Sequence, residues 1–159
     1  MMLVMFRKAF LHSAAILIVM IATAAAYSQE IYDYQPVQPR WATAENPTGE
    51  PGSGGKTNDG RKGRAMIVVD AGESVTLAEV SNTSGTVRRI WMTFNDRSPV
   101  MLRGLRIQCF WDGAAKPAVD VPLGDFFSVP LGIVTPFQSA LFASPEGRSF
   151  NSFVPMPFR

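Results

Sequence analysis

Apolar and polar residues alternate in short runs along the chain from Arg64 onward. In the segment 105–111, Leu, Ile, Cys and Trp occupy every second position, which places them on one face of a β-strand. Asp112-Gly113 follows as a turn signal, and Ala118–Val121 is predicted to return as the partner strand. The pattern therefore predicts an antiparallel pair of strands in this part of the chain.

Other segments carry the same kind of signal. In the segment 87–94, Ile90, Met92 and Phe94 share one face of a predicted strand. The remaining predicted strands are Met66–Asp70, Val75–Val80, Gly132–Thr135, Ala140–Ala143 and Phe150–Met156. No segment shows the apolar period of a helix of three turns. Many short strands separated by turn residues predict an all-β fold, a β-sandwich of the jelly-roll type.

The segment 27–63 lacks a sustained apolar period and is rich in Pro, Gly, Asn and Thr. We expect it to form an extended arm and a Gly-rich loop, and 64–159 to form the jelly-roll domain. The closing segment Phe150–Phe158 is apolar, with Met156 and Phe158 expected to be exposed. Such an uncovered sheet edge pairs readily with other chains, so we expect a domain that is incomplete at this end.

The first 26 residues have the pattern of a secretory signal peptide. Arg7 and Lys8 precede the uncharged run Ser13–Ala26, which ends in three alanines. An uncleaved membrane anchor is the alternative, because no charged residue occurs between Lys8 and Glu30. Cleavage predicts a secreted or periplasmic protein that has no membrane contact thereafter.

The composition excludes several classes of partner and catalytic site. Removing Arg7 and Lys8 from the 15 Lys and Arg leaves 13, equal to the 13 Asp and Glu, and their scattered positions do not favour a nucleic-acid partner. His12 is the only histidine, so the mature chain has no Ser-His, Cys-His or His-metal site of its own. Carboxylates remain as general acids or bases. We expect no metal ion and no cofactor, and we expect Cys109, the single cysteine, to be a small buried apolar residue.

The sequence GEPGSGGKT at 49–57 differs from a phosphate-binding P-loop. It has five residues instead of four between its first glycine and the Gly-Lys pair, and no apolar strand precedes it. Its polar groups suit a sugar better: Glu45, Asn46 and Glu50 offer acceptors, Lys56 offers a charge, and the glycines let the backbone approach a ligand. A plain linker is the alternative interpretation.

Two tryptophans and two aspartates are further candidates. Trp91 and Trp111 are platforms on which a sugar ring can stack, with a core position as the alternative. We place Trp91 in the core and leave Trp111 open, because it lies at a strand end beside Asp112. Asp125, set between Leu-Gly and Phe-Phe, is either an acid or sugar ligand in an apolar setting or a turn cap. Asp120 is expected to be a solvated or paired surface residue.

Three sequence islands resemble one enzyme family: ENPTGE…GGK at 45–56, IWMT at 90–93 and WDGAAKPAVDVPLGDFF at 111–127. They are similar to glycoside hydrolase family 172, the difructose-anhydride and α-fructofuranosidase type, over about Glu45 to Arg159. The resemblance implies a jelly-roll fold, assembly into a homo-trimer or homo-hexamer, and a carbohydrate substrate, namely fructofuranosides or related furanosides and oligosaccharides. It also implies a retaining mechanism with one glutamate as nucleophile and another as acid/base.

Members of that family are longer than this chain, so the resemblance implies that the chain is the N-terminal half of an exported enzyme. Neither catalytic glutamate can be matched to a position here, and the resemblance places both beyond the equivalent of Arg159. The expected substrate-binding residues are Glu45, Asn46, Glu50, Lys56, Trp111, Asp112 and Asp125. Two alternatives stay open: a non-catalytic carbohydrate-binding or assembly jelly-roll module, and a truncated gene product.

Overall fold

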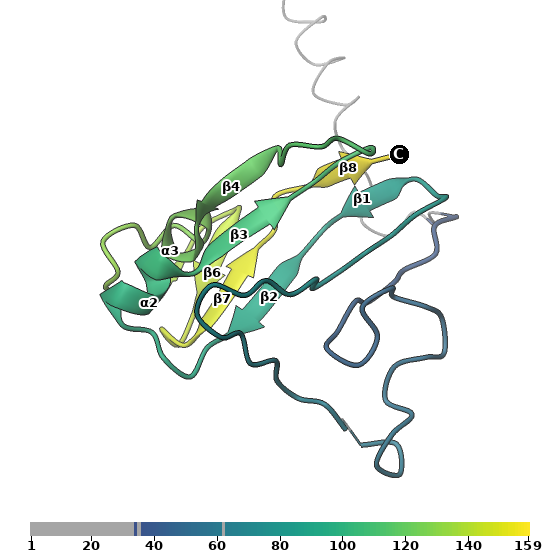
Figure 1. Ribbon diagram of the computed structural model, residues 1–159, viewed down its shortest axis with the longest axis horizontal. Helices are drawn as coiled ribbons and strands as arrows, with labels where there is room; N and C mark the ends of the chain where they lie inside the picture. The colour runs from purple at the N-terminus through teal and green to yellow at the C-terminus, as the bar shows by residue number, and fades with distance from the viewer. Residues whose placement is uncertain (1–33, 35, 62) are drawn as a thin grey trace, which may run out of the picture. The chain divides into compact units, whose positions relative to one another are not determined.

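The computed structural model describes residues 34, 36–61 and 63–159 (Figure 1). The chain divides into two compact units, Met1–Trp41 and Ala42–Arg159. In the first unit the described residues are exposed and have no regular secondary structure, and the predicted signal peptide lies outside the described residues. In the described part of the chain, no helix is long and apolar enough to span a bilayer.

The second unit is built mainly from short antiparallel strands, which confirms the β-rich prediction. The strands are β1 Gly85–Val87, β2 Ile90–Thr93, β3 Arg106–Cys109, β4 Val119–Pro122, β5 Phe137–Gln138, β6 Phe142–Ser144, β7 Ser149–Ser152 and β8 Met156–Phe158. One sheet has four strands in the order β2-β7-β6-β5, and two further pairs join β1 to β8 and β3 to β4.

Two short helices interrupt the strands, α2 Pro99–Gly104 and α3 Leu123–Phe126. The α2 helix begins after Ser98, whose side-chain oxygen accepts a hydrogen bond from the Met101 amide at 3.2 Å. Pro99 suits the first helical position, where no amide donor is required. The two helices pack against each other (Figure 1), because the α3 residues Leu123 and Gly124 are buried in the same region as Leu102 of α2.

One hydrophobic core joins the helices and the β3–β4 pair to the four-stranded sheet. Its buried members are Leu102, Ile107, Leu123, Phe127, Val129 and Phe150. Ile90 and Met92 of β2 and Phe94 pack against this cluster from the sheet side. The sequence pattern had placed these three residues on one apolar face, and the structure confirms that face.

The β3–β4 pair is antiparallel as predicted, and Asp112-Gly113 forms the predicted turn. Ile107 lies opposite Val121, and both pack in the core. Asp112 and Gly113 have φ of 52° and 73°, and the Ala114 amide donates to the Trp111 carbonyl at 2.9 Å. Two consecutive positive φ values suit a type I′ turn, in which Asp-Gly is a favoured pair.

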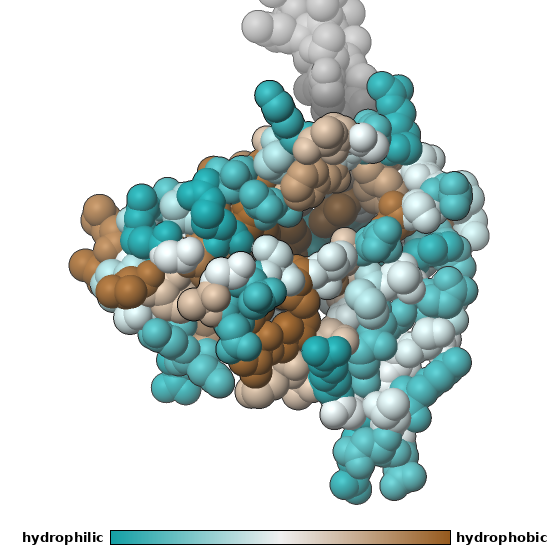
Figure 2. All heavy atoms as spheres, in the orientation of Figure 1, coloured by the Kyte–Doolittle hydropathy of each residue, from teal (hydrophilic) through white to brown (hydrophobic). Residues whose placement is uncertain are grey.

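Several predicted strands are wrong or shifted. The segments 66–70, 75–80 and 132–135 form no strand, and the predicted strand 87–94 is broken into β1 and β2. Met66 and Val68 are 59% and 78% exposed, so the described part of the chain covers less than half of each residue. On the face shown in Figure 2, apolar residues reach the surface in separate patches between polar ones. A run of Ile and Val forms a strand only when another strand supplies its hydrogen-bond partners.

The closing segment is less exposed than its sequence suggests. The strand β8 pairs with β1, with Met156 opposite Val87 and Phe158 opposite Gly85. Both Met156 and Phe158 are half-buried, and the Phe158 ring lies where a side chain at Gly85 would stand. The prediction that these two residues are exposed is therefore wrong, because β1 covers them.

Candidate functional site

The loop that precedes the sheets is organised by its own polar side chains. Asn46 is 7% exposed, and its amide donates to the Glu50 carbonyl at 3.1 Å and accepts from the Glu50 amide at 3.0 Å. The Glu45 carboxylate accepts from the Thr57 hydroxyl and from the Gly63 amide, both at 3.2 Å. Asn46 and Glu45 therefore fix the shape of this loop, which carries its own hydrogen bonds and is not a plain linker.

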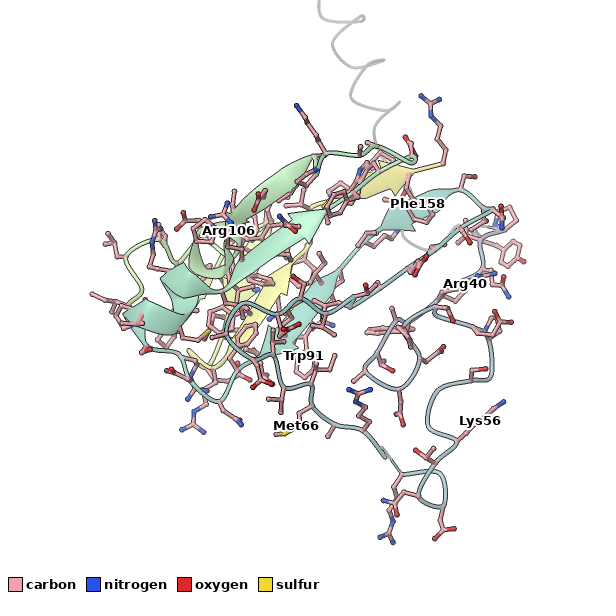
Figure 3. All side chains as sticks on the ribbon, in the orientation of Figure 1. Arg40, Lys56, Met66, Trp91, Arg106 and Phe158 are labelled. Carbon is pink, nitrogen blue, oxygen red and sulfur yellow. The ribbon has the colours of Figure 1, made fainter. Side chains whose placement is uncertain are left out.

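The other two predicted residues of this loop point into solvent. Glu50 and Lys56 are exposed, and Lys56 extends away from the strands (Figure 3). Their charged groups are thus accessible to a ligand. Whether they contact a sugar stays a prediction.

Trp111 and Asp112 lie at the turn between β3 and β4. Trp111 is half-buried. The Asp112 carboxylate accepts a hydrogen bond from the Arg159 amide at 2.8 Å, and its second oxygen lies 3.9 Å from Arg159 Nε. Asp112 thus ties this turn to the β8 end, in addition to any role in binding.

Asp125 lies in α3, at the opposite end of the β3–β4 pair from Asp112. Its carboxylate forms a hydrogen-bonded ion pair with Arg103 of α2. Leu123, Gly124 and Phe127 around it are buried. The apolar part of the PLGDFF motif therefore belongs to the core, and Asp125 joins the two helices. The structure does not gather Asp112 and Asp125 into one site.

The carboxyl groups whose pKa is displaced are all displaced downward. The Arg106 guanidinium, 2.8 Å from Asp120, lowers the pKa of that carboxyl, which confirms the predicted surface pairing. A hydrogen bond from the Ser149 hydroxyl lowers the pKa of Glu146, and the Ser98 amide lowers that of Asp96. A general acid in glycoside hydrolysis needs the opposite shift, so these three carboxyl groups are unsuited to that role.

The next question is whether the described residues include a metal-binding cluster or a reactive thiol. No group of three His, Cys, Asp or Glu side chains suited to a metal ion occurs among residues 34, 36–61 and 63–159. Burial raises the pKa of the Cys109 thiol, which packs against the core cluster. A protonated thiol is a poor nucleophile. Cys109 packs against the core as an apolar residue, but it is half-buried and not fully buried as predicted.

Trp91 is the aromatic residue that the sequence interpretation misplaced. Trp91 is 49% exposed, so the prediction of a core position is wrong. The reason is the alternation of β2: Ile90 and Met92 turn toward the core, and the residue between them must point the other way. Trp91 therefore stands on the outer side of the four-stranded sheet.

Three further side chains come together on this outer side. Asn151 of β7 lies opposite Trp91 and is 5% exposed. Its side-chain oxygen accepts from Arg89 Nε at 3.2 Å and from Arg89 Nη2 at 2.7 Å, and its amide nitrogen donates to the Ala143 carbonyl at 3.1 Å. The Arg89 guanidinium also lies 5.6 Å from the ring centroid of Phe153. We call Arg89, Trp91, Asn151 and Phe153 the Trp91 face.

The Trp91 face combines an aromatic surface with fixed polar groups. An exposed indole offers an apolar platform, and the adjoining guanidinium offers hydrogen-bond donors. The alternation in 87–94 already places Arg89 and Trp91 on the same side of the chain. The contribution of β7 has no local signal, because Asn151 is 62 positions away from Arg89.

Comparison with known proteins gives the family. The family model described as GH172 domain-like matches residues 60–159. No curated protein matches the chain. The matched part contains all eight strands, the Trp91 face, Trp111, Asp112 and Asp125, and leaves Glu45, Asn46, Glu50 and Lys56 outside. The match extends over more than half of the chain, which therefore belongs to the GH172 domain-like family.

Proposed function

We propose that this chain is the carbohydrate-binding, N-terminal part of an exported glycoside hydrolase that acts on fructofuranosides or related furanosides. The family match supports the class of enzyme. The observation that carries the binding role is the exposed Trp91 on the outer side of the sheet, together with the exposed Arg89 guanidinium that the buried Asn151 amide holds in place. Sugar-binding sites combine such a flat apolar surface with a few placed polar groups.

The proposed fold is a jelly roll, and the proposed assembly is a homo-trimer or homo-hexamer. Jelly rolls use eight strands in two sheets, and the described part of the chain has eight short antiparallel strands. The strands β2 and β5 lie at the edges of the four-stranded sheet, where further strands can add. These features support the proposal at the level of strand number and open edges.

The proposed reaction is retaining hydrolysis, with both catalytic glutamates supplied from outside this chain. The support is electrostatic: each displaced carboxyl pKa is lowered, and Asp112 and Asp125 are engaged with arginines. A retaining enzyme needs two carboxyl groups about 5 Å apart, one of them with a raised pKa. The role of this chain is to bind and orient the sugar.

Because both catalytic glutamates are proposed to lie outside this chain, we expect that the chain by itself does not hydrolyse an aryl-fructofuranoside or aryl-arabinofuranoside. Release of the chromophore, followed over hours, should equal the rate in buffer. Turnover that disappears in Glu45→Gln, Glu50→Gln or Asp125→Asn would contradict the prediction and would place the active site within this chain.

Binding should depend on the Trp91 face. Trp91→Ala should weaken the binding of a furanosidic oligosaccharide by about two- to thirteen-fold, the range given by an aromatic contact worth about 0.5–1.5 kcal/mol. Isothermal titration calorimetry measures the effect. Trp41→Ala is the matched control, because Trp41 is also exposed (67%) and lies in the other compact unit. Equal losses in the two variants would remove Trp91 from the site.

A further inference from the structure

We infer that the Trp91 face recognises a carbohydrate that carries a carboxylate, with Arg89 holding the anionic group. The inference rests on the proposed function, since it assumes that Trp91 receives a sugar ring. It adds the chemical class of that sugar: a uronic acid, or an oligosaccharide that contains one.

The first reason is that Arg89 is fixed in place without being neutralised. Its Nε and Nη2 groups both donate to the side-chain oxygen of Asn151, which carries no charge. Its guanidinium carbon lies 5.6 Å from the Phe153 ring centroid. In the described residues, the ion pairs of arginines are Arg103–Asp125, Arg106–Asp120 and Arg159–Asp112. Arg89 is in none of them, so its positive charge is available to a ligand.

The second reason is that donors remain on the guanidinium. Arg89 Nη1 donates to no acceptor in the described part of the chain. Two N–H groups of a planar guanidinium match the two oxygens of a carboxylate, and such a charged pair is stronger than a hydrogen bond to a hydroxyl. Because Asn151 and Phe153 already hold the side chain, little side-chain entropy is lost when an anion binds.

The third reason is the position of Trp91 relative to this cation. Arg89 immediately precedes β2, and Trp91 is the second residue of this strand. Asn151 of β7 lies opposite Trp91 and accepts hydrogen bonds from Arg89. Neighbours of this kind on a strand point to the same side. A sugar ring on the indole would thus bring a ring substituent within reach of the guanidinium. A simple anion would use Arg89 alone and would gain nothing from Trp91.

The test compares two ligands of equal length on the full chain: an oligosaccharide of galacturonic acid and the corresponding neutral oligosaccharide of galactose. Titration calorimetry at neutral pH should give tighter binding of the uronate by about ten-fold or more, the factor expected for one hydrogen-bonded charge pair. Arg89→Gln should weaken binding of the uronate by about ten-fold more than binding of the neutral sugar, so that the preference is lost. Trp91→Ala should weaken both ligands.

Arg88→Gln is the matched control. Arg88 is the preceding residue and is exposed, so its removal changes the net charge equally and leaves the Trp91 face intact. It should retain the uronate preference. Thermal unfolding followed by circular dichroism checks that Arg89→Gln is folded. If it is unfolded, Arg89→Lys replaces it, because lysine keeps the charge but lacks the planar guanidinium. Loss of the uronate preference in Arg89→Lys would then support the inference, and an unchanged preference would overturn it.

Each outcome bears on a different statement. Equal binding of the two ligands, or equal loss in Arg89→Gln and Arg88→Gln, overturns the inference while leaving the proposed sugar binding intact. Free acetate that competes as strongly as the uronate also overturns it, because Arg89 would then be a site for a simple anion. Binding of neither ligand to the folded wild-type chain overturns the inference, and the proposed function is overturned as well only if a neutral fructofuranosidic oligosaccharide also fails to bind.

Discussion

Replacing Phe150 by alanine should lower the free energy of unfolding by about 3–5 kcal/mol, the cost of removing a fully buried phenylalanine side chain. Phe150 is 1% exposed, and its ring centroid lies 5.4 Å from that of Phe94 and 5.7 Å from that of Phe127. It connects the four-stranded sheet to the helical side of the core. Because domains are stable by only about 5–15 kcal/mol, the variant should be largely unfolded or close to it.

Urea denaturation followed by circular dichroism measures this effect, and Phe110→Ala is the matched control. Phe110 follows β3 directly, and its side chain is 52% exposed. Its removal should cost about 1 kcal/mol or less, the range for a surface substitution. Similar midpoints for Phe150→Ala and Phe110→Ala would show that the sheet and the helices do not share one core.

The β3–β4 hairpin shows what the sequence can predict. Its alternation and its Asp-Gly turn are local signals, each contained within a few residues, and both were read correctly. Ile90, Met92 and Phe94 were also assigned correctly to one face. Local periodicity determines which side chains share a face, and for these residues that is enough to identify the core.

Sequence patterns do not predict whether a segment forms a strand when its pairing partner is far away in the sequence. The segments 66–70 and 75–80 have the composition of strands but remain exposed and unpaired as strands in the described structure. Composition reports only that a residue fits a strand, and pairing depends on which other strand lies beside it. The same limit applies to Phe158, whose burial depends on β1, far away in the sequence.

The residues of the candidate site that were identified from the sequence are those with a local signal. Asn46 and Glu45 were identified from their residue types, and the structure shows that they bond within their own loop. The Trp91 face was missed because Arg89 and Asn151 meet only through the pairing of β2 with β7. Knowing which face of β2 packs in the core would have placed Trp91 outside, because alternation leaves it no other side.

The PLGDFF motif has a structural reason that does not involve a ligand. Gly124 of α3 lies against α2, and a Cβ atom at this position would stand 2.8 Å from the Val129 carbonyl oxygen and 3.2 Å from Leu102 Cβ. The Val129 amide donates to the Gly124 carbonyl at 2.7 Å, so the loop after α3 cannot retreat without losing this bond. Glycine is required here because only its hydrogen fits between the two segments.

Gly124→Ala should therefore lower the free energy of unfolding by about 1–3 kcal/mol, the cost of forcing an extra methyl group into a packed core. Gly104→Ala is the matched control, because a Cβ at Gly104 meets nothing within 4 Å. Gly104 is the last residue of α2, where alanine should be neutral or stabilising by up to about 1 kcal/mol. Urea denaturation of both variants should give shifts of opposite sign or clearly different size. A Gly124→Ala chain as stable as the wild type would mean that α3 moves away from α2, and that the glycine of the motif serves something other than packing.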